Sequence, residues 1–134
     1  MSEGNVEVVR RTMDAYIVGD REAYYDFMAE DIEIRPDASR WPEAEPFRGL
    51  EEYRRFIAEI DQDWEGGARA EIREVLPAGD RVVVRLDWGG TGRTSGIDLR
   101  SSLSVIFTVR EGQITKIEFF FDHATALEAA GLRE

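Results

Sequence analysis

The chain has 134 residues, of which 43% are hydrophobic and 34% charged, enough for one globular core and too few for two. Its 17 Lys and Arg stand against 28 Asp and Glu, a net charge of −11 that disfavours nucleic acids and anionic membranes as partners. There is no cysteine and one histidine, His123, which excludes disulfides, thiol nucleophiles and thiolate or multi-histidine metal sites. We expect no cofactor and no metal. Without a leader-like start or the ~18 apolar residues of a membrane span, the expected location is the cytoplasm.

The first third of the chain predicts two helices, a strand and a loop. Apolar residues recur at helical spacing over residues 5–18, and Asp20 can cap a short second helix. Residues 32–34 alternate isoleucine with glutamate, as strands do. Residues 35–48 hold three of the four prolines, which predicts a long loop over an apolar surface. This loop, with Trp41, is a candidate lid.

The rest of the chain predicts one long helix, four strands and a closing helix. The helix is indicated by apolar residues three and four apart, namely Leu50, Tyr53, Ile57, Ile60 and Trp64. Strand-like runs separated by turn signals cover residues 68–76, 81–90, 97–109 and 113–121. Consecutive strands with short turns predict an antiparallel meander. Asp122 can cap the closing helix over 124–130.

Helices followed by a run of strands predict an α+β fold, a curved antiparallel sheet that forms a cone with the N-terminal helices over its concave face. The segments GDREAYYDFMAEDIEI, FRGLEEYRRFI, EGQITKIEFFFD and ALEAAGL, in this order, resemble the SnoaL-like branch of the nuclear transport factor 2-like superfamily. The resemblance covers essentially the whole chain, residues 1–134, and implies a single domain with a cystatin-like α+β barrel. Enzymes, ligand binders and interaction modules share this fold, so function must come from the pocket.

Arg85 and Asp87 share one face of a predicted strand, because alternate residues point to the same side. They are either a solvent-facing ion pair or part of a site. The spacing is similar to that of limonene epoxide hydrolases, and this resemblance implies an aspartate that activates water and an arginine that orients it inside the cone. The acid of that family falls at Phe119 here. Asp87 is thus a candidate general base, with Arg85 as its orienting partner.

Asp122 is a second candidate acid/base, in a spacing similar to that of SnoaL-like polyketide cyclases. The alternative is that it only caps the last helix, which is the interpretation we favour. The cyclases' accompanying histidine has no counterpart at Ile106 or Thr108. Alignment on the ketosteroid isomerases places their three functional positions at Thr12, Pro36 and Ser104, none of which keeps the required residue type.

The predicted cavity is lined by aromatic residues and by serines that face the Arg85 and Asp87 pair. The candidate ligand-contacting residues are Tyr16, Trp41, Phe56, Ser102, Ser104, Phe119 and Phe121. We expect the cone to bind a small apolar or polycyclic molecule, with carboxylate acid/base chemistry of isomerase, cyclase or hydrolase type as one possibility. The alternative is a non-catalytic ligand-binding or protein-interaction module.

A homodimer is predicted through the outer face of the sheet. Alternation gathers Val82, Val84, Leu86 and Trp88 on one side of their strand, and residues 103–109 of the next strand add a second apolar row. If Arg85 and Asp87 face the cavity, this apolar side must face outward. Such a large apolar surface requires a partner subunit to cover it.

Overall fold

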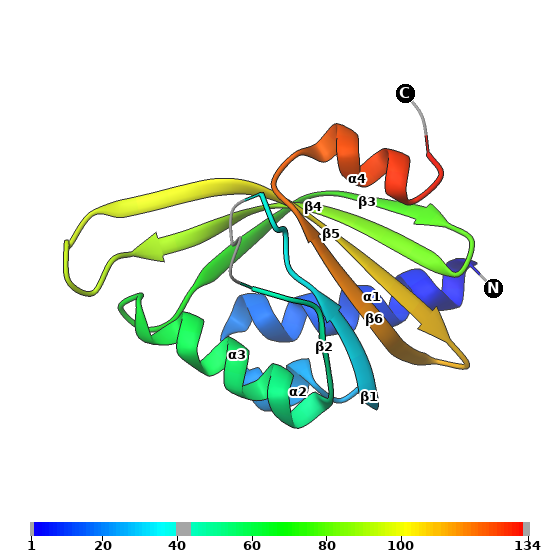
Figure 1. Cartoon of the computed structure of the whole chain (residues 1–134), viewed down its shortest axis with the longest axis horizontal. Coiled ribbons are helices and arrows are strands. Elements are labelled where there is room, and N and C mark those ends of the chain that lie inside the picture. The colour runs from blue at the N-terminus through cyan, green and yellow to red at the C-terminus, as the bar shows by residue number, and fades with distance from the viewer. Residues whose placement is uncertain (1, 40–43, 133–134) are drawn as a thin grey trace.

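The structure is a computed structural model that describes residues 2–39 and 44–132. A curved sheet has three helices on one side and a fourth on the other (Figure 1). The helices are α1 (Ser2–Val18), α2 (Arg21–Tyr24), α3 (Leu50–Gln62) and α4 (His123–Ala129). The strands are β1 (Met28–Arg35), β2 (Phe47–Arg48), β3 (Arg69–Ala78), β4 (Arg81–Thr91), β5 (Asp98–Arg110) and β6 (Gln113–Phe120).

The six strands form one sheet in the order β2-β1-β6-β5-β4-β3. Strands β3 to β6 are the predicted antiparallel meander, whereas β1 runs parallel to β6. Helices α1 to α3 lie on the concave side of the sheet (Figure 1). The predicted α+β class is therefore confirmed, with a mostly antiparallel sheet covered by N-terminal helices.

Local signals placed the elements to within a few residues. The side chain of Asp20 accepts a hydrogen bond from the backbone N–H of Ala23 at 3.1 Å, so it caps α2 as predicted. Helix α3 ends at Gln62, and Trp64 instead forms an isolated bridge to Gly92. Trp64 packs edge-on against Trp88, with ring centroids 5.6 Å apart.

The glycine-rich segment after Trp88 is part of the sheet and continues its ladder. Gly89 pairs with Arg100, and Gly90 pairs with Leu99. A Cβ atom at Gly89 would lie 2.0 Å from the carbonyl oxygen of Leu99, so only glycine allows the two strands to approach this closely.

The orientation predicted for strands β4 and β5 is wrong. Their apolar residues, including Val84 and Phe107, pack in the main core against α1 and α3, so the apolar face is concave. The physical reason is that α1 and α3 each carry an apolar stripe, for example Val9 and Ile57, that needs an apolar surface to cover it. The polar residues of the same strands consequently lie on the convex face.

This reversal removes the ground on which the homodimer was predicted. The face formed by Val82, Val84, Leu86 and Trp88 is covered within one chain by α1 and α3, so no partner subunit is needed to shield it. Dimerisation remains a prediction, and the apolar face of β4 and β5 no longer supports it.

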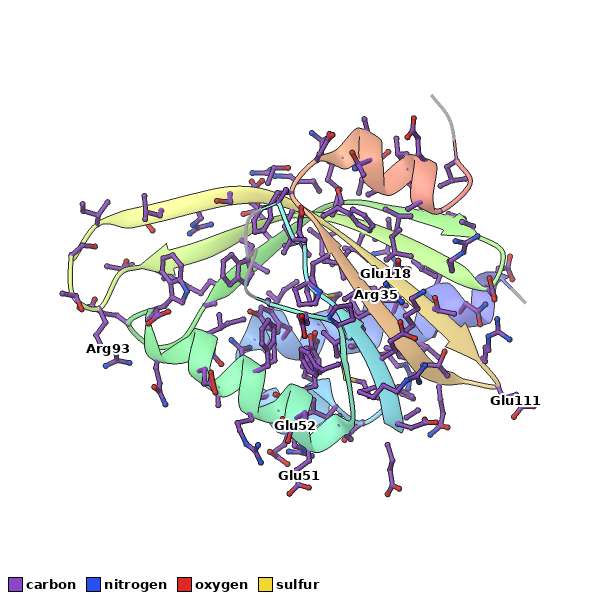
Figure 2. All side chains as sticks on the ribbon, viewed as in Figure 1. Arg35, Glu51, Glu52, Arg93, Glu111 and Glu118 are labelled. Atoms are coloured by element: carbon purple, nitrogen blue, oxygen red, sulfur yellow. The ribbon has the colours of Figure 1, made fainter. Side chains whose placement is uncertain are left out.

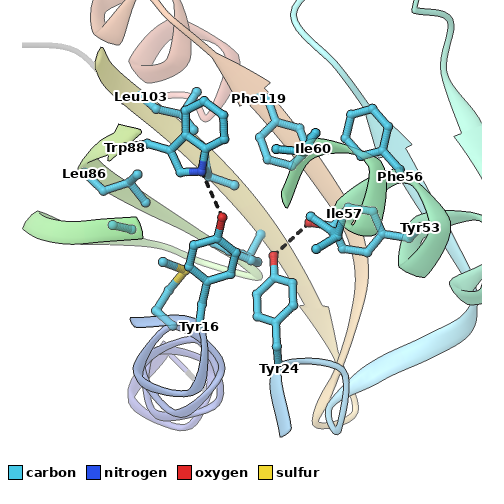
Figure 3. Close-up of a pocket in the computed structure, with 14 residues that line it drawn as sticks. Tyr16, Tyr24, Tyr53, Phe56, Ile57, Ile60, Leu86, Trp88, Leu103 and Phe119 are labelled. Atoms are coloured by element: carbon cyan, nitrogen blue, oxygen red, sulfur yellow. Dashed lines mark hydrogen bonds between the residues drawn. The ribbon is translucent and has the colours of Figure 1, made fainter. Parts of the chain in front are cut away.

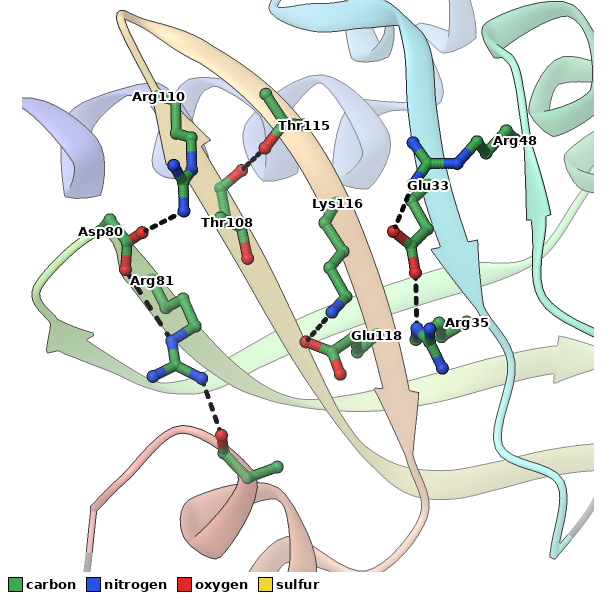
Figure 4. Close-up of polar contacts among 11 residues, drawn as sticks. Glu33, Arg35, Arg48, Asp80, Arg81, Thr108, Arg110, Thr115, Lys116 and Glu118 are labelled. Carbon is green, nitrogen blue, oxygen red and sulfur yellow. Dashed lines mark hydrogen bonds and ion pairs between the residues drawn. The ribbon is translucent and has the colours of Figure 1, made fainter.

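The convex face carries ion pairs and one small apolar cluster. Glu33 lies between Arg35 and Arg48, with N···O distances of 2.6 and 3.1 Å, and Lys116 lies 3.8 Å from Glu118 (Figure 4). The apolar cluster lies under α4 and consists of Val83, Ile106 and Ala130 with partly buried neighbours.

Long charged side chains also project from the helices and turns, among them Glu51, Glu52, Arg93 and Glu111 (Figure 2). Among the described helices, none is long and apolar enough to cross a membrane.

Candidate functional site

A pocket lies between the concave face of the sheet and the helices (Figure 3). Its cavity volume is about 40 Å³. A buried water needs roughly 10–15 Å³ of such space, so the pocket has room for only a few water molecules. Its lining residues are Met13, Tyr16, Tyr24, Tyr53, Phe56, Ile57, Ile60, Ala70, Leu86, Trp88, Leu103, Val105, Phe107 and Phe119.

The pocket has a buried end and a partly exposed end. Tyr24 and Tyr53 are 4% and 0% exposed, because α2 and α3 bury them against each other. Phe56, Trp88 and Phe119 are only partly buried. The lining of the pocket is therefore most accessible to solvent at the end where these three aromatic side chains lie.

Three tyrosines supply hydroxyl groups to this apolar wall. The indole Nε1–H of Trp88 donates to the Tyr16 hydroxyl at 2.9 Å, and the hydroxyls of Tyr24 and Tyr53 share a hydrogen bond of 2.8 Å (Figure 3). Each partner comes from a different element: α1, α2, α3 and β4. The tyrosine hydroxyls are thus held in place by contacts between elements distant in sequence.

Arg21 contacts both the ring and the backbone of Tyr16. Its guanidinium group lies 3.9 Å from the centre of the Tyr16 ring and donates to the Tyr16 carbonyl oxygen at 2.9 Å. Asp61 accepts two hydrogen bonds from Arg21, at 2.9 and 3.1 Å. A bidentate pair of this kind has a defined geometry, so the end of α1 that carries Tyr16 is well ordered relative to α3.

Burial raises the pKa of each of these tyrosines above its ordinary value. For Tyr16, burial is the largest influence, partly offset by the Trp88 hydrogen bond. Burial likewise raises the pKa of Tyr24 and that of Tyr53, and at Tyr53 the neighbouring Tyr24 hydroxyl acts in the same direction as burial. The three hydroxyls therefore stay protonated near neutral pH and act as neutral hydrogen-bonding groups.

None of the described residues that line the pocket is an aspartate, glutamate, histidine, lysine or arginine. In the part of the chain that the structure describes, no cluster of three or more His, Asp or Glu could hold a metal ion either. General acid/base chemistry needs a titratable group within hydrogen-bond reach of the reacting atoms. The pocket in this arrangement offers binding surface and hydroxyl donors, without a carboxylate.

The structure places Arg85 and Asp87 outside the pocket, on the convex face. The predicted cross-strand neighbours are correct, since Arg85 pairs with Ser104 and Asp87 with Ser102, but the cavity lies on the opposite side of the sheet. Asp87 accepts hydrogen bonds from Arg73, one of them from Nε at 2.7 Å. The expectation that Arg85 and Asp87 form a pair inside the cone is wrong, because the apolar side of β4 is the side that the helices cover.

Ser104 and His123 form a contact that the sequence did not predict. Ser104 is 1% exposed, and its hydroxyl lies 2.7 Å from His123 Nδ1. The other ring nitrogen, Nε2, lies 3.9 Å from Glu74. This contact joins the start of α4 to β5 on the convex face, so Ser104 is not a pocket residue.

Asp122 acts as the N-cap of α4, as the favoured interpretation predicted. Its carboxylate accepts from the backbone N–H of Ala124 at 3.2 Å and from the Thr125 hydroxyl at 2.7 Å. Its neighbour Phe121 does not line the pocket, and the Phe121 backbone N–H donates to Asp37 at 2.7 Å. Both carboxylates thus organise the backbone beside the last strand.

Of the remaining predicted ligand contacts, the structure brings Tyr16, Phe56 and Phe119 together in the pocket lining. Ser102 lies on the convex face with its partner Asp87. Trp41 lies outside the described residues, and so does the central part of the predicted lid.

Tyr24, Tyr53 and Trp88 line the pocket although none of them is among the ligand contacts predicted from the sequence. Tyr53 was assigned to the buried stripe of α3 without attention to its hydroxyl, and Trp88 was assigned to the outer face. A signal was present: each side chain places one polar atom at the tip of an apolar body, and such atoms need a partner when buried. Three such side chains on elements that cover one cavity indicate that their polar atoms lie in that cavity.

The comparisons with known proteins agree with this architecture. A family model described as a SnoaL-like domain matches residues 9–117. A search of the curated proteins finds no match. Solved structures match over nearly the whole chain at low sequence identity, which shows that the fold is shared.

Three of these structures illustrate the range. TerC, co-crystallised with polyporic acid, is 23% identical with a TM-score of 0.75, covering 96% of this chain and 98% of its own. A protein from Catenulispora acidiphila with a ketosteroid isomerase-like fold, in complex with trimethylamine, is 20% identical with a TM-score of 0.73 and coverages of 95% and 94%. A nuclear transport factor 2-like protein of unknown function from Burkholderia pseudomallei is 20% identical with a TM-score of 0.76 and coverages of 93% and 95%.

Proposed function

The chain belongs to the SnoaL-like domain family, and from that premise we propose that it binds a small, neutral, largely apolar molecule in the pocket between α1, α3 and the concave face of the sheet. The observation that carries this proposal is the lining itself: fourteen residues, all apolar or aromatic, whose side-chain polar groups are three tyrosine hydroxyls and the Trp88 indole N–H. Ligand pockets in proteins typically combine an apolar wall with a few fixed polar groups.

Binding without carboxylate catalysis is the function that this geometry supports best. The predicted acid/base residues Asp87 and Asp122 already accept hydrogen bonds from Arg73, Ala124 and Thr125, away from the pocket. An isomerase, cyclase or hydrolase of the carboxylate type needs its titratable group at the ligand. The alternative of a non-catalytic binding module therefore replaces the acid/base enzyme as the leading interpretation.

The small cavity volume has a consequence for how a ligand enters. A space of about 40 Å³ is smaller than any aromatic ligand, so side chains must move aside during binding. The partly buried Phe56, Ile60, Trp88 and Phe119 are suited to this, because they have solvent on one side. Relatives support small-molecule binding, since TerC was co-crystallised with polyporic acid and the Catenulispora protein is in complex with trimethylamine.

The test is a titration of isotope-labelled protein with ethylbenzene, a small apolar probe, followed by nuclear magnetic resonance. We expect saturable shifts at Leu103, Val105 and the Trp88 indole. The variant Ala70→Leu adds bulk to the pocket wall and should weaken binding about tenfold or more. The matched control Ala124→Leu adds the same bulk on exposed α4 and should leave binding unchanged. Absence of saturable shifts, or equal affinity in both variants, would contradict the proposal.

A further inference from the structure

A second, more open cleft lies where α1 and α3 end, beside the start of β3 and the hairpin between β4 and β5. Its volume is about 610 Å³, which is in the range of small-molecule sites in proteins. The charged side chains of its lining are three arginines, Arg21, Arg69 and Arg93, and one aspartate, Asp61. We call this space the arginine cleft. Its lining carries more positive than negative charge, although the chain as a whole has a net charge of −11.

Arg21 and Asp61 neutralise each other within the arginine cleft. Asp61 accepts two hydrogen bonds from Arg21 and a third from the backbone N–H of Ala68, at 2.9 Å. A carboxylate that is paired in this way repels an approaching anion less than a free one would. The positive charge of the cleft therefore comes from Arg69 and Arg93.

Arg69 and Arg93 have no carboxylate partner in the part of the chain that the structure describes. Most of the described arginines lie within 4.0 Å of a carboxylate oxygen, and the exceptions are Arg10, Arg69, Arg85 and Arg93. Two of these four line the same cleft. In a chain with 28 acidic residues, these two guanidinium groups are left available for an anion from outside.

Both guanidinium groups are oriented by hydrogen bonds that leave other donors unused. Arg93 donates from Nε to the carbonyl oxygen of Gln62 at 2.9 Å and from Nη2 to that of Trp64 at 3.3 Å, and Figure 2 shows its side chain beside the end of α3. Arg69 donates to the Thr91 hydroxyl at 3.3 Å. Since a guanidinium group has more N–H donors than these contacts use, an anion can bind without displacing them.

The wall of the cleft beside these arginines is apolar and exposed. Ile17 and Val18, at the end of α1, line the cleft and are 38% and 78% exposed. Only two other large hydrophobic side chains, Ile97 and Leu99, are exposed in the part of the chain that the structure describes. Exposed apolar groups next to unpaired cations suit a ligand that has both an apolar and an anionic part.

We propose that the arginine cleft binds a small amphiphilic carboxylate, with the carboxylate group on Arg69 and Arg93 and a short hydrocarbon chain against Ile17 and Val18. Guanidinium groups match the two oxygens of a carboxylate with parallel hydrogen bonds. A single negative charge fits better than a phosphate dianion, because the net charge of the chain repels the second charge. This site is separate from the aromatic pocket of the proposed function, although Tyr16 lines both.

The experiment compares octanoate with 1-octanol, two probes of equal chain length that differ in charge, in titrations of isotope-labelled protein followed by nuclear magnetic resonance. Octanoate should shift the Nε–H signals of Arg69 and Arg93 and the backbone amide of Gly67 in a saturable manner, and 1-octanol should bind there more weakly. The double variant Arg69→Gln with Arg93→Gln should weaken octanoate binding about five- to tenfold. Added NaCl should also weaken it, because salt screens exposed charges.

The matched control is the double variant Arg10→Gln with Arg85→Gln. It removes the same charge from two exposed arginines that also lack a carboxylate partner among the described residues but lie outside the cleft, and it should leave octanoate binding nearly unchanged. The single variant Arg69→Gln removes only the contact with Thr91, so it should fold normally and show part of the loss, about two- to threefold.

Four results would overturn the proposed site. They are no saturable shift with octanoate, equal loss of affinity in the two double variants, binding of 1-octanol at the cleft as tight as that of octanoate, and octanoate shifts confined to the Trp88 indole. Equal loss would mean that net charge alone attracts the probe, and shifts at Trp88 alone would place it in the aromatic pocket. Ethylbenzene binding in that pocket is measured separately, so failure of either proposal is distinguishable from failure of the other.

Discussion

The concave and convex faces of strands β4 and β5 are built from alternate residues of the same two segments, yet they have opposite chemistry. The concave face carries Leu86, Trp88 and Phe107 and forms the core and the pocket wall. The convex face carries Arg85 and Asp87, and the latter is held by Arg73. The difference is produced by what covers each face, because two long helices bury one side and only the short α4 covers part of the other.

A motif at the right spacing does not by itself locate a site, as the Arg-x-Asp pair of β4 shows. Arg85 and Asp87 do lie on one face of β4, and their predicted cross-strand neighbours Ser104 and Ser102 are correct. The side of the sheet that encloses a cavity is decided by the helices, which need the more apolar face. The charged side chains of Arg85 and Asp87 consequently lie on the convex face, where water can solvate them.

The largest effect is expected from alkaline pH, which acts on the concave side. All four tyrosines of the chain have a raised pKa, that of Tyr25 to about 12 and mainly through burial. The unfolded chain loses these protons near pH ~10, whereas the folded protein keeps them. Stability is therefore full below about pH 10 and falls above it, by up to ~1.4 kcal/mol per pH unit for each tyrosine.

The measurement is the ultraviolet absorbance of tyrosinate during a pH titration, alongside circular dichroism. Ionisation of the tyrosines should coincide with unfolding. If tyrosinate forms near pH ~10 while the fold persists, the hydroxyls are in contact with water and the concave pocket is open.

The next effect separates the two faces by mutation. Phe107→Ala removes a side chain that is 1% exposed in the core and should lower the free energy of unfolding by ~3–5 kcal/mol. The control Ser102→Ala changes an exposed residue on the convex side of the same strand and should stay within ~0.5 kcal/mol of wild type. Denaturant unfolding checks both, and a cost below ~1 kcal/mol for Phe107→Ala would mean that this face is not the core.

A smaller effect is expected where α4 begins. Asp122→Ala removes the carboxylate that accepts from Ala124 and Thr125 and should cost ~0.5–2 kcal/mol of stability, whereas Asp122→Asn should cost less because asparagine caps about as well. If Asp122→Asn lowered the stability as much as Asp122→Ala, the stabilising effect of Asp122 would come from its charge and not from its hydrogen bonds as a cap. Ethylbenzene affinity should not change in either variant, because Asp122 does not line the pocket.

The smallest effect is expected for the convex charges. Arg85→Ala should stay within ~0.5 kcal/mol of wild type, since the side chain is exposed, and Asp87→Ala should lose only the solvent-screened contact with Arg73. The double variant should be additive in denaturant unfolding, because the two side chains do not depend on each other. Strong non-additivity would indicate a coupled pair and would restore Asp87 as a candidate for chemistry.

Much of the architecture follows from short-range patterns in the sequence. The apolar stripe of α3, the caps at Asp20 and Asp122 and the turns between the strands are set by residues within a few positions of one another. Strand alternation also determines that Arg85 and Asp87 share a face with Ser104 and Ser102. The fold class could therefore be predicted, together with three of the residues that line the pocket.

The site itself depends on contacts that no local pattern encodes. Trp88 meets Tyr16 across 72 positions, and Tyr24 meets Tyr53 across 29. Alternation divides each strand into two faces but cannot say which one turns inward, because that choice depends on which face the helices bury. The sequence by itself determined the helices, the strands and which residues share a face of each strand. Only the tertiary structure decided that tyrosine hydroxyls, and not carboxylates, face the cavity.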